Sequence, residues 1–127
     1  MTPPGAYSGG GWHIDTPHRG IKALMYLTDV DSVDAGAFAM LRQYKGIVHN
    51  NDPGKRTTRY NADEIDRQIA QHGAVIEPIL GKAGTVVLFD ITSVHRGLPV
   101  GRGQLPRLVL TNYYENPIAK CRPPHQA

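Results

Sequence analysis

Short runs of aliphatic and aromatic residues, separated by glycine, proline, aspartate and asparagine, place the strongest restriction on the fold of this chain. Runs of this composition favour extended strands, and the residues between them favour turns. Isolated strands cannot bury their apolar side chains, so we expect them to pack together as a β-sandwich or a barrel. The predicted strands are Lys22–Thr28, Ala37–Leu41, Ala74–Ile79, Thr85–Ile91 and Arg107–Tyr114.

A single helix is expected among these strands. Ile65 and Ile69 are four residues apart, which places both side chains on one face of a helix. Asn61 is a suitable N-cap with a glutamate three residues later, which is the spacing of a capping box, and Gly73 is a suitable stop. We therefore predict a helix over Ala62–His72, inserted into a mainly β domain.

Two predicted strands carry apolar side chains on both of their faces, Thr85–Ile91 and Arg107–Thr111. In Thr85–Ile91 nearly every position is apolar, whereas a strand with one solvated face is apolar at every second position. The predicted helix carries too narrow an apolar stripe to cover a second sheet face. We expect the cover to come from a second copy of the chain in a homodimer, or from a portion of the domain outside this sequence.

The composition fits one folded domain spanning residues 1–127. No run approaches the ~20 consecutive apolar residues that cross a bilayer. The net charge is +3, but the lysines and arginines are scattered, so we expect neither a membrane nor a nucleic-acid partner. Cys121 is the only cysteine and cannot form an internal disulfide, which favours a cytoplasmic location.

The segment Trp12-His13-Ile14-Asp15 contains two adjacent candidate metal ligands. Residues two apart on an extended strand project to the same side, so His13 and Asp15 face one space. A neutral imidazole and a carboxylate are both good ligands for a divalent metal ion. Because a histidine and an aspartate at this spacing are common by chance, the pair needs a third ligand to indicate a site.

His95 is the best-placed candidate for that third ligand. It follows the apolar run Thr85–Ile91 and precedes Gly97, so it lies where a strand gives way to a turn. Two histidines and one carboxylate leave half of an octahedron open, which is the arrangement of non-haem iron(II) oxygenases. The remaining histidines fall in polar, proline-rich or helix-terminal segments: His18, His49, His72 and His125.

Arg107 adds a possible anion-binding group to these ligands. It opens the last predicted strand, after a turn at Gly97–Leu105, so a hairpin would bring Arg107 and His95 to one cavity. A guanidinium grips a carboxylate through two parallel hydrogen bonds. A metal with an arginine nearby therefore suits a ligand that chelates at one end and carries a carboxylate at the other, such as 2-oxoglutarate. Arg102, at the tip of the loop, is the competing clamp.

Taken together, these motifs resemble the phytanoyl-CoA dioxygenase family of iron(II)- and 2-oxoglutarate-dependent dioxygenases. The resemblance extends from about Gly10 to Asn116 and keeps the family's order of histidine, aspartate, histidine and arginine. The segments that carry it are Trp12–Asp15, Ala23–Asp31 with Gly36–Phe38, Gly84–Gly97 and Pro106–Tyr114.

This resemblance implies a double-stranded β-helix, the jelly-roll that cupins also use, with one inserted helix and in a shortened form. It implies that His13, Asp15 and His95 bind iron(II) and that Arg107 binds the far carboxylate of 2-oxoglutarate. The implied activity is the oxidative decarboxylation of 2-oxoglutarate to succinate, coupled to hydroxylation of a small-molecule substrate.

Two features depart from the family pattern. Family members have a long region before the Trp-His-x-Asp motif, whereas Trp12 lies near the start of this sequence, so we expect a domain without that region. Many members place a hydroxyl residue two positions after the distal histidine, where this chain has Gly97. Two alternatives therefore stay open: a cupin-like metal-binding protein with other chemistry, and a shortened non-catalytic module that keeps the metal ligands.

Overall fold

The computed structural model describes residues 11–16, 19–43, 46–47 and 58–115. Within these residues the chain forms seven strands and one helix. In chain order they are β1 (Gly20–Tyr26), β2 (Phe38–Gln43), β3 (Gly46–Ile47), α1 (Ala62–His72), β4 (Val75–Ile79), β5 (Val86–Asp90), β6 (His95–Gly97) and β7 (Val109–Glu115). The described part of the chain has no helix that is long and apolar enough to cross a lipid bilayer.

All five predicted strands are present, with ends shifted by no more than two residues. The structure adds the short strands β3 and β6, which the sequence analysis did not predict. Both consist of two or three residues, too few for a composition pattern to be recognised. The mainly β prediction is therefore confirmed.

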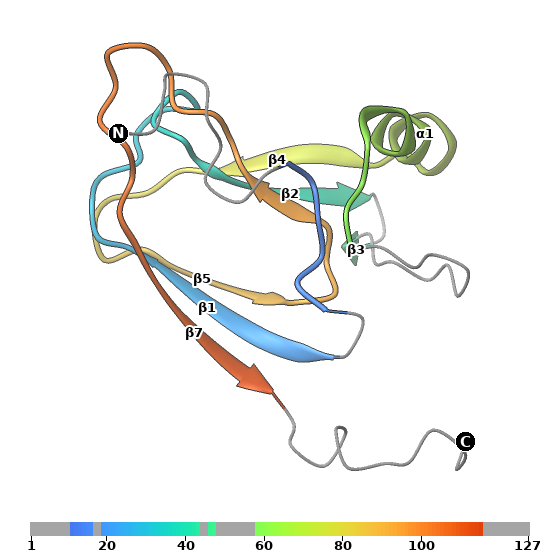
Figure 1. Ribbon diagram of the computed structural model, residues 1–127, viewed down its shortest axis with the longest axis horizontal. Helices are drawn as coiled ribbons and strands as arrows, with labels where there is room; N and C mark the ends of the chain where they lie inside the picture. Colours follow the sequence, from blue (N-terminus) through green and yellow to red (C-terminus); the bar gives the residue numbers. More distant parts are fainter. Residues whose placement is uncertain (1–10, 17–18, 44–45, 48–57, 116–127) are drawn as a thin grey trace.

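The strands form two antiparallel sheets that face each other as two layers (Figure 1). One sheet has the order β5-β1-β7. In the other, β2 is central and pairs with β3, β4 and β6. The main core lies between the two layers and contains Leu24, Tyr26, Val87 and Phe89 from the first sheet and Phe38 and Met40 from the second.

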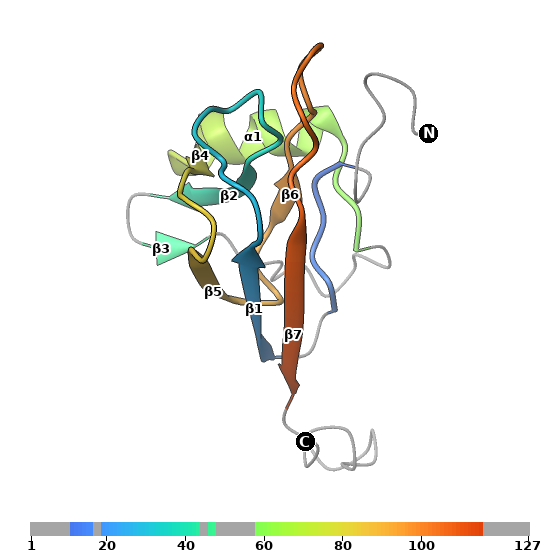
Figure 2. The ribbon, with the colours of Figure 1, turned by 90° about the vertical axis from the view of Figure 1, so that its left-hand side faces the viewer.

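Helix α1 covers the outer face of the sheet centred on β2. Its buried residue Ile65 packs in a second cluster with Ala39 and Leu41 of β2 and with Trp12 and Ile14. From the side, α1 lies beside β2 and β4 and away from β1 and β7 (Figure 2). Strand β2, at the centre of this sheet, is consequently covered on both faces by the chain itself.

The ends of α1 are those predicted from the sequence. The Asn61 side chain accepts a hydrogen bond from the backbone N–H of Glu64, and the Glu64 carboxylate accepts one from the backbone N–H of Asn61, which completes the capping box. Gly73 ends the helix with a φ of 63°, a left-handed conformation in which a side chain would be strained. The prediction of a helix over Ala62–His72 is confirmed to the residue.

The outer face of the β5-β1-β7 sheet has no comparable cover from the described residues. Side chains on β5 alternate between buried and exposed positions, and the exposed ones, Val86 and Leu88, are aliphatic. They share the outer face with exposed residues of the other two strands of this sheet, namely Ile21 of β1 and Leu110 and Tyr114 of β7. The expected two-sided apolar strand is thus present, and the partner that covers its second side stays a prediction.

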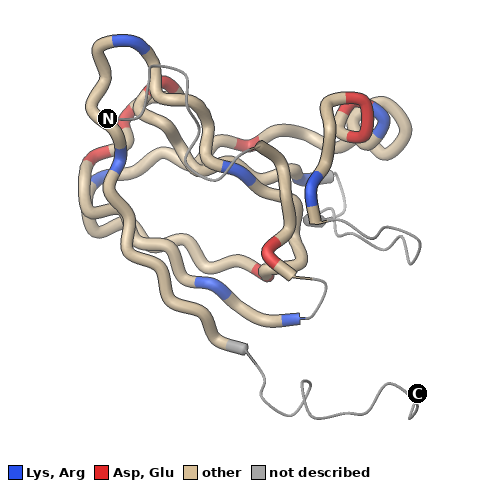
Figure 3. Tube along the Cα trace, viewed as in Figure 1, with Lys and Arg blue, Asp and Glu red and all other residues tan. Residues whose placement is uncertain are grey.

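Basic residues are spread over separate elements of the described chain (Figure 3). Lys22 lies on β1, Arg42 on β2, Arg67 on α1 and Arg96 on β6. The lysines and arginines of the described residues are therefore scattered in the folded structure, as they are along the sequence.

Candidate metal centre

His13 and His95 are held side by side by their backbones. The N–H of His13 donates to the carbonyl of His95 over 3.0 Å, and the N–H of His95 donates to the carbonyl of His13 over 2.9 Å. The N–H of Asp15 donates to the carbonyl of Ile91 over 2.9 Å, which fixes the other end of the motif. The His-x-Asp segment is thereby fixed alongside β6 and the start of the β5–β6 connection.

The three predicted ligands converge on one point. Nε2 of His13 lies 3.6 Å from Oδ1 of Asp15, and Nε2 of His95 lies 3.4 Å from the same oxygen. One ligand atom from each residue lies within 4.8 Å of the others. Among the described residues this is the only group of three histidine, cysteine or acidic side chains with such spacing.

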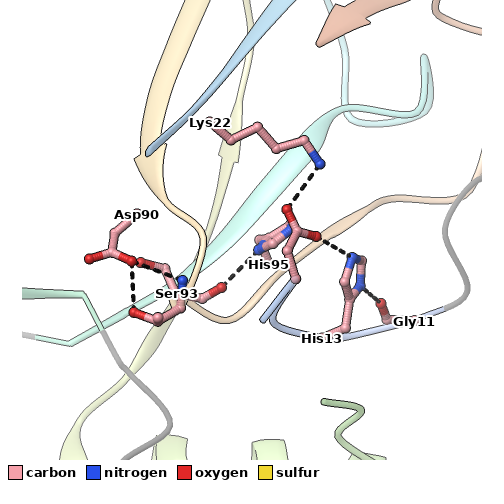
Figure 4. Close-up of polar contacts among 8 residues, drawn as sticks. Gly11, His13, Lys22, Asp90, Ser93 and His95 are labelled. Atoms are coloured by element: carbon pink, nitrogen blue, oxygen red, sulfur yellow. Dashed lines mark hydrogen bonds and ion pairs between the residues drawn. The ribbon is translucent and has the colours of Figure 1, made fainter. Parts of the chain in front are cut away.

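Backbone carbonyls orient both imidazole rings (Figure 4). Nδ1 of His13 lies 2.8 Å from the carbonyl oxygen of Gly11, and Nδ1 of His95 lies 2.8 Å from that of Ser93. A carbonyl only accepts hydrogen bonds, so each Nδ1 carries the proton and donates it. Each Nε2 faces Asp15, where it can donate to the carboxylate when it carries a proton and can bind a metal ion when it carries none.

Aromatic rings shield the inner side of this cluster. The ring centroid of His95 lies 4.8 Å from that of Phe89 and 5.4 Å from that of Phe38. His95 is almost fully buried, whereas His13 and Asp15 are partly exposed. The cluster therefore has a closed apolar side and an open side that solvent or a ligand can reach.

Lys22 is a charged residue beside the three candidate ligands, and it was not predicted from the sequence. Its Nζ lies 3.1 Å from Oδ2 of Asp15 and 4.5 Å from the centre of the Tyr113 ring. Burial alone would lower the pKa of Lys22, but the hydrogen bonds with Tyr113 and Asp15 raise it above its ordinary value. Lys22 is therefore an ammonium ion beside the carboxylate.

The pKa of Asp15 reflects the same contacts. Burial would raise it, but hydrogen bonds from His13 and His95, the charge of His95 and the hydrogen bond from Lys22 together hold the pKa of Asp15 well below its usual range. Asp15 is consequently a carboxylate at any physiological pH, which is the form that binds a metal ion.

Arg107 is not positioned as the sequence analysis expected. The predicted hairpin is wrong, because β6 pairs with β2 in one sheet and β7 pairs with β1 in the other. Arg107 precedes β7 and lies near the Tyr26 end of β1, since Tyr26 pairs with Val109. Its contacts are with the Gly36 carbonyl and with Tyr26 rather than with the histidines and Asp15.

The guanidinium of Arg107 nevertheless has one donor without a hydrogen-bond partner among the described residues. Nη1 donates to the Gly36 carbonyl, whereas Nε is buried and has no hydrogen-bond partner among the described residues. Burial lowers the pKa of Arg107, and the nearby Tyr26 opposes that shift. A desolvated cation with an unpaired donor is suited to a carboxylate, which would accept from Nε and Nη2 together.

The competing candidates lie away from the cluster or outside the described residues. Arg102 is exposed in the loop between β6 and β7, and His72 is exposed at the end of α1. His18, His49, His125 and Cys121 fall outside the described residues.

Searches against protein-family models, curated proteins and solved structures found no match to this chain.

Proposed function

We propose that this protein is an iron(II)- and 2-oxoglutarate-dependent dioxygenase that hydroxylates a small molecule. The observation that carries the proposal is the convergence of Nε2 of His13 and Nε2 of His95 on Oδ1 of Asp15. Two imidazoles and one carboxylate that leave the remaining positions open form the ligand set of non-haem iron(II) oxygenases.

The spacing of the donor atoms fits a metal ion. Two ligands bound at right angles with bonds of ~2.1 Å lie ~3.0 Å apart. The observed separations of 3.6 Å and 3.4 Å are slightly wider, so binding needs only a small inward movement of the side chains. Both histidines have Nδ1 committed to backbone carbonyls, so their rings are already oriented for coordination through Nε2.

The chemistry of the proposed reaction divides between the metal and the chain. When bound, iron(II) supplies the activation of dioxygen that is coupled to the decarboxylation of 2-oxoglutarate. The rings of Phe38 and Phe89 exclude water from the inner side of His95. Arg107 binds the far carboxylate of the cosubstrate through its unpaired Nε and so orients the 2-oxo acid end toward His13, Asp15 and His95.

We further propose that the two facing sheets are those of a double-stranded β-helix. In support, both sheets are antiparallel, their shared core lies between them, and the three ligands lie at the edge of that core. The fold class matters for function because open jelly-rolls commonly bind ligands between their sheets.

Metal binding is the first test of this function. Anaerobic calorimetric titration with iron(II) should give one site per chain, and His13→Ala, Asp15→Ala and His95→Ala should each abolish or greatly weaken it. His72→Ala, at the exposed end of α1, should leave the affinity unchanged and is the matched control. A loss of binding in the control, or its retention in the His95 variant, would mean that the ligand assignment is wrong.

Cosubstrate binding is the second test. A hydrogen bond to a charged group contributes about 1.5–3 kcal/mol, so Arg107→Leu should weaken 2-oxoglutarate binding to the metal-loaded protein roughly 10- to 100-fold. Arg102→Leu should have little effect, because Arg102 is exposed in a loop. Equal weakening by both variants would argue against Arg107 as the clamp.

One observation favours a second candidate function. Arg107 already donates to the Gly36 carbonyl and does not contact the three ligands, so the metal and the arginine need not serve one ligand. The alternative is a cupin-like metal-binding protein, or a non-catalytic module that keeps the ligands. Iron(II) binding that depends on His95, together with no 2-oxoglutarate binding, would support this alternative over the oxygenase.

A further inference from the structure

Lys22 lies on the inner face of β1 and is directed at the metal ligand Asp15. Its side chain is 12% exposed and that of Asp15 is 13% exposed, so the pair is largely withdrawn from water. Nζ of Lys22 contacts Oδ2 of Asp15, whereas both histidines face Oδ1. The two oxygens of the carboxylate thus have different partners.

A lysine at this position is costly for the fold. Leu24 and Tyr26 continue the same face of β1 and are buried in the core, and an apolar residue at position 22 would continue that core without desolvating a charge. The ammonium is instead held between the Asp15 carboxylate and two aromatic rings, at 4.5 Å from the centre of Tyr113 and 5.9 Å from that of Phe89. The position of the Lys22 ammonium is therefore fixed by the carboxylate on one side and by the aromatic rings on the other.

We infer that Lys22 is a positioning residue of the metal centre, which holds Oδ2 of Asp15 so that the carboxylate binds the metal through Oδ1 alone. This inference rests on the proposed metal binding. A carboxylate that is free to rotate can bind a metal ion through both of its oxygens. The second oxygen would then fill one of the coordination positions that the two histidines and Asp15 Oδ1 leave open. By occupying Oδ2, Lys22 keeps that position available.

The experiment uses cobalt(II) as the probe, because its absorption spectrum reports the number and arrangement of its ligands. Lys22→Met removes the ammonium but keeps the length of the side chain, and Lys22→Arg keeps the charge and the donor. The matched control is Lys82→Met, because Nζ of Lys82 lies 3.0 Å from Oδ2 of Asp29 in a similar ion pair on the surface. Affinity and spectrum are measured anaerobically on the full chain.

We expect Lys22→Met to weaken cobalt(II) binding at least tenfold, within the roughly 10- to 100-fold range found when residues that orient metal ligands are changed. The cobalt spectrum should change as well, because the second oxygen enters the coordination sphere. Lys22→Arg should restore the wild-type spectrum in part, and Lys82→Met should change neither quantity. A merely structural role of Lys22 would leave the spectrum of the bound metal unchanged.

Tyr113→Leu provides a second variant that leaves Lys22 and Asp15 intact, should Lys22→Met fail to fold. Without the ring beside it, the ammonium is held less firmly, and cobalt(II) binding should weaken by a smaller factor with a spectral change in the same direction. If the folded Lys22→Met protein has the wild-type affinity and spectrum, the inference about Lys22 is wrong, while the proposed metal site is unaffected. If Lys22→Met does not fold, the same result in Tyr113→Leu has the same meaning. Absence of cobalt(II) binding by the wild-type protein would overturn the proposed function as well.

Discussion

The outer faces of the two sheets carry similar aliphatic side chains in different surroundings. On β2, Leu41 is fully buried beneath Ile65 of α1. On β5, Leu88 has the corresponding outward orientation but is 68% exposed, opposite Ala23 of β1. Both side chains are leucines that point away from the main core, and they differ in whether another element packs over them. An apolar side chain on the outer face of a sheet therefore indicates that another element packs on that face. It does not indicate whether that element belongs to the same chain or to a partner.

Truncation of one leucine on each face is the most direct way to test this contrast. Leu41→Ala should lower the free energy of unfolding by about 2–5 kcal/mol, because it leaves a cavity beneath α1. Measured at a concentration at which the chain is monomeric, Leu88→Ala should change it by no more than ~0.5 kcal/mol, as is usual for exposed positions. Urea unfolding of both variants checks the prediction. Equal losses would mean that Leu88 is covered in solution.

Metal binding should stabilise the covered side of the molecule more than the uncovered side. At a free iron(II) concentration of 100 times its Kd, the gain in the free energy of unfolding is about 2.7 kcal/mol. His95 lies on β6 of the covered sheet, so hydrogen exchange should slow most at the paired N–H groups of His13 and His95 and least in β7. Asp15→Ala should remove the effect. Uniform slowing across both sheets would contradict the regional contrast.

The cap of α1 tests how firmly the cover itself is held. Asn61→Ala removes the hydrogen bond to the backbone N–H of Glu64 and should cost ~1 kcal/mol of stability. Asn112→Ala, at an exposed position of β7, is the control and should stay within ~0.5 kcal/mol of the wild type. Thermal or urea unfolding measures both. If Asn61→Ala lowers the free energy of unfolding no more than Asn112→Ala does, the cap contributes little to holding α1 over the sheet.

The smallest effect on stability is expected from a charge on the uncovered face. Leu88→Glu should leave the free energy of unfolding of the isolated chain within ~0.5 kcal/mol, but it should dissociate the homodimer that we expect to cover this face. Sedimentation at micromolar concentration distinguishes dimer from monomer. Leu105→Glu, which changes a leucine that is 87% exposed in a loop, is the control. A monomeric wild-type protein with cooperative unfolding would show that the dimer prediction is wrong.

Local signals explain which parts of the fold could be predicted from the sequence. Helix α1 was predicted to the residue because both of its ends depend on neighbouring residues, the Asn61 cap and the Gly73 stop. Strand β6 was missed because it has three residues and is a strand only through its pairing with β2, which is distant in sequence. The hairpin was wrong for a related reason, because no local signal shows that the loop after Gly97 crosses from one sheet to the other.

The candidate site follows the same division. His13 and Asp15 could be paired from their spacing alone, because alternation along a strand is a local property. Lys22 could not be recognised, since apolar residues occupy both faces of β1 around it and leave the inward direction undecided. A lysine within an apolar strand was the one available signal, and only the structure shows that it is directed at Asp15.

The reciprocal backbone hydrogen bonds between His13 and His95 join residues that are 82 positions apart, the difference between their numbers. Closing a loop of that length costs conformational entropy, so we expect these two hydrogen bonds to form late in folding, after much of the chain between them is structured. The unfolded chain has the His13–Asp15 pair alone, which is too few ligands to hold iron firmly. Under the proposed function, iron(II) would therefore bind after folding, and the bound ion would act as a removable cross-link that disfavours unfolding of the chain.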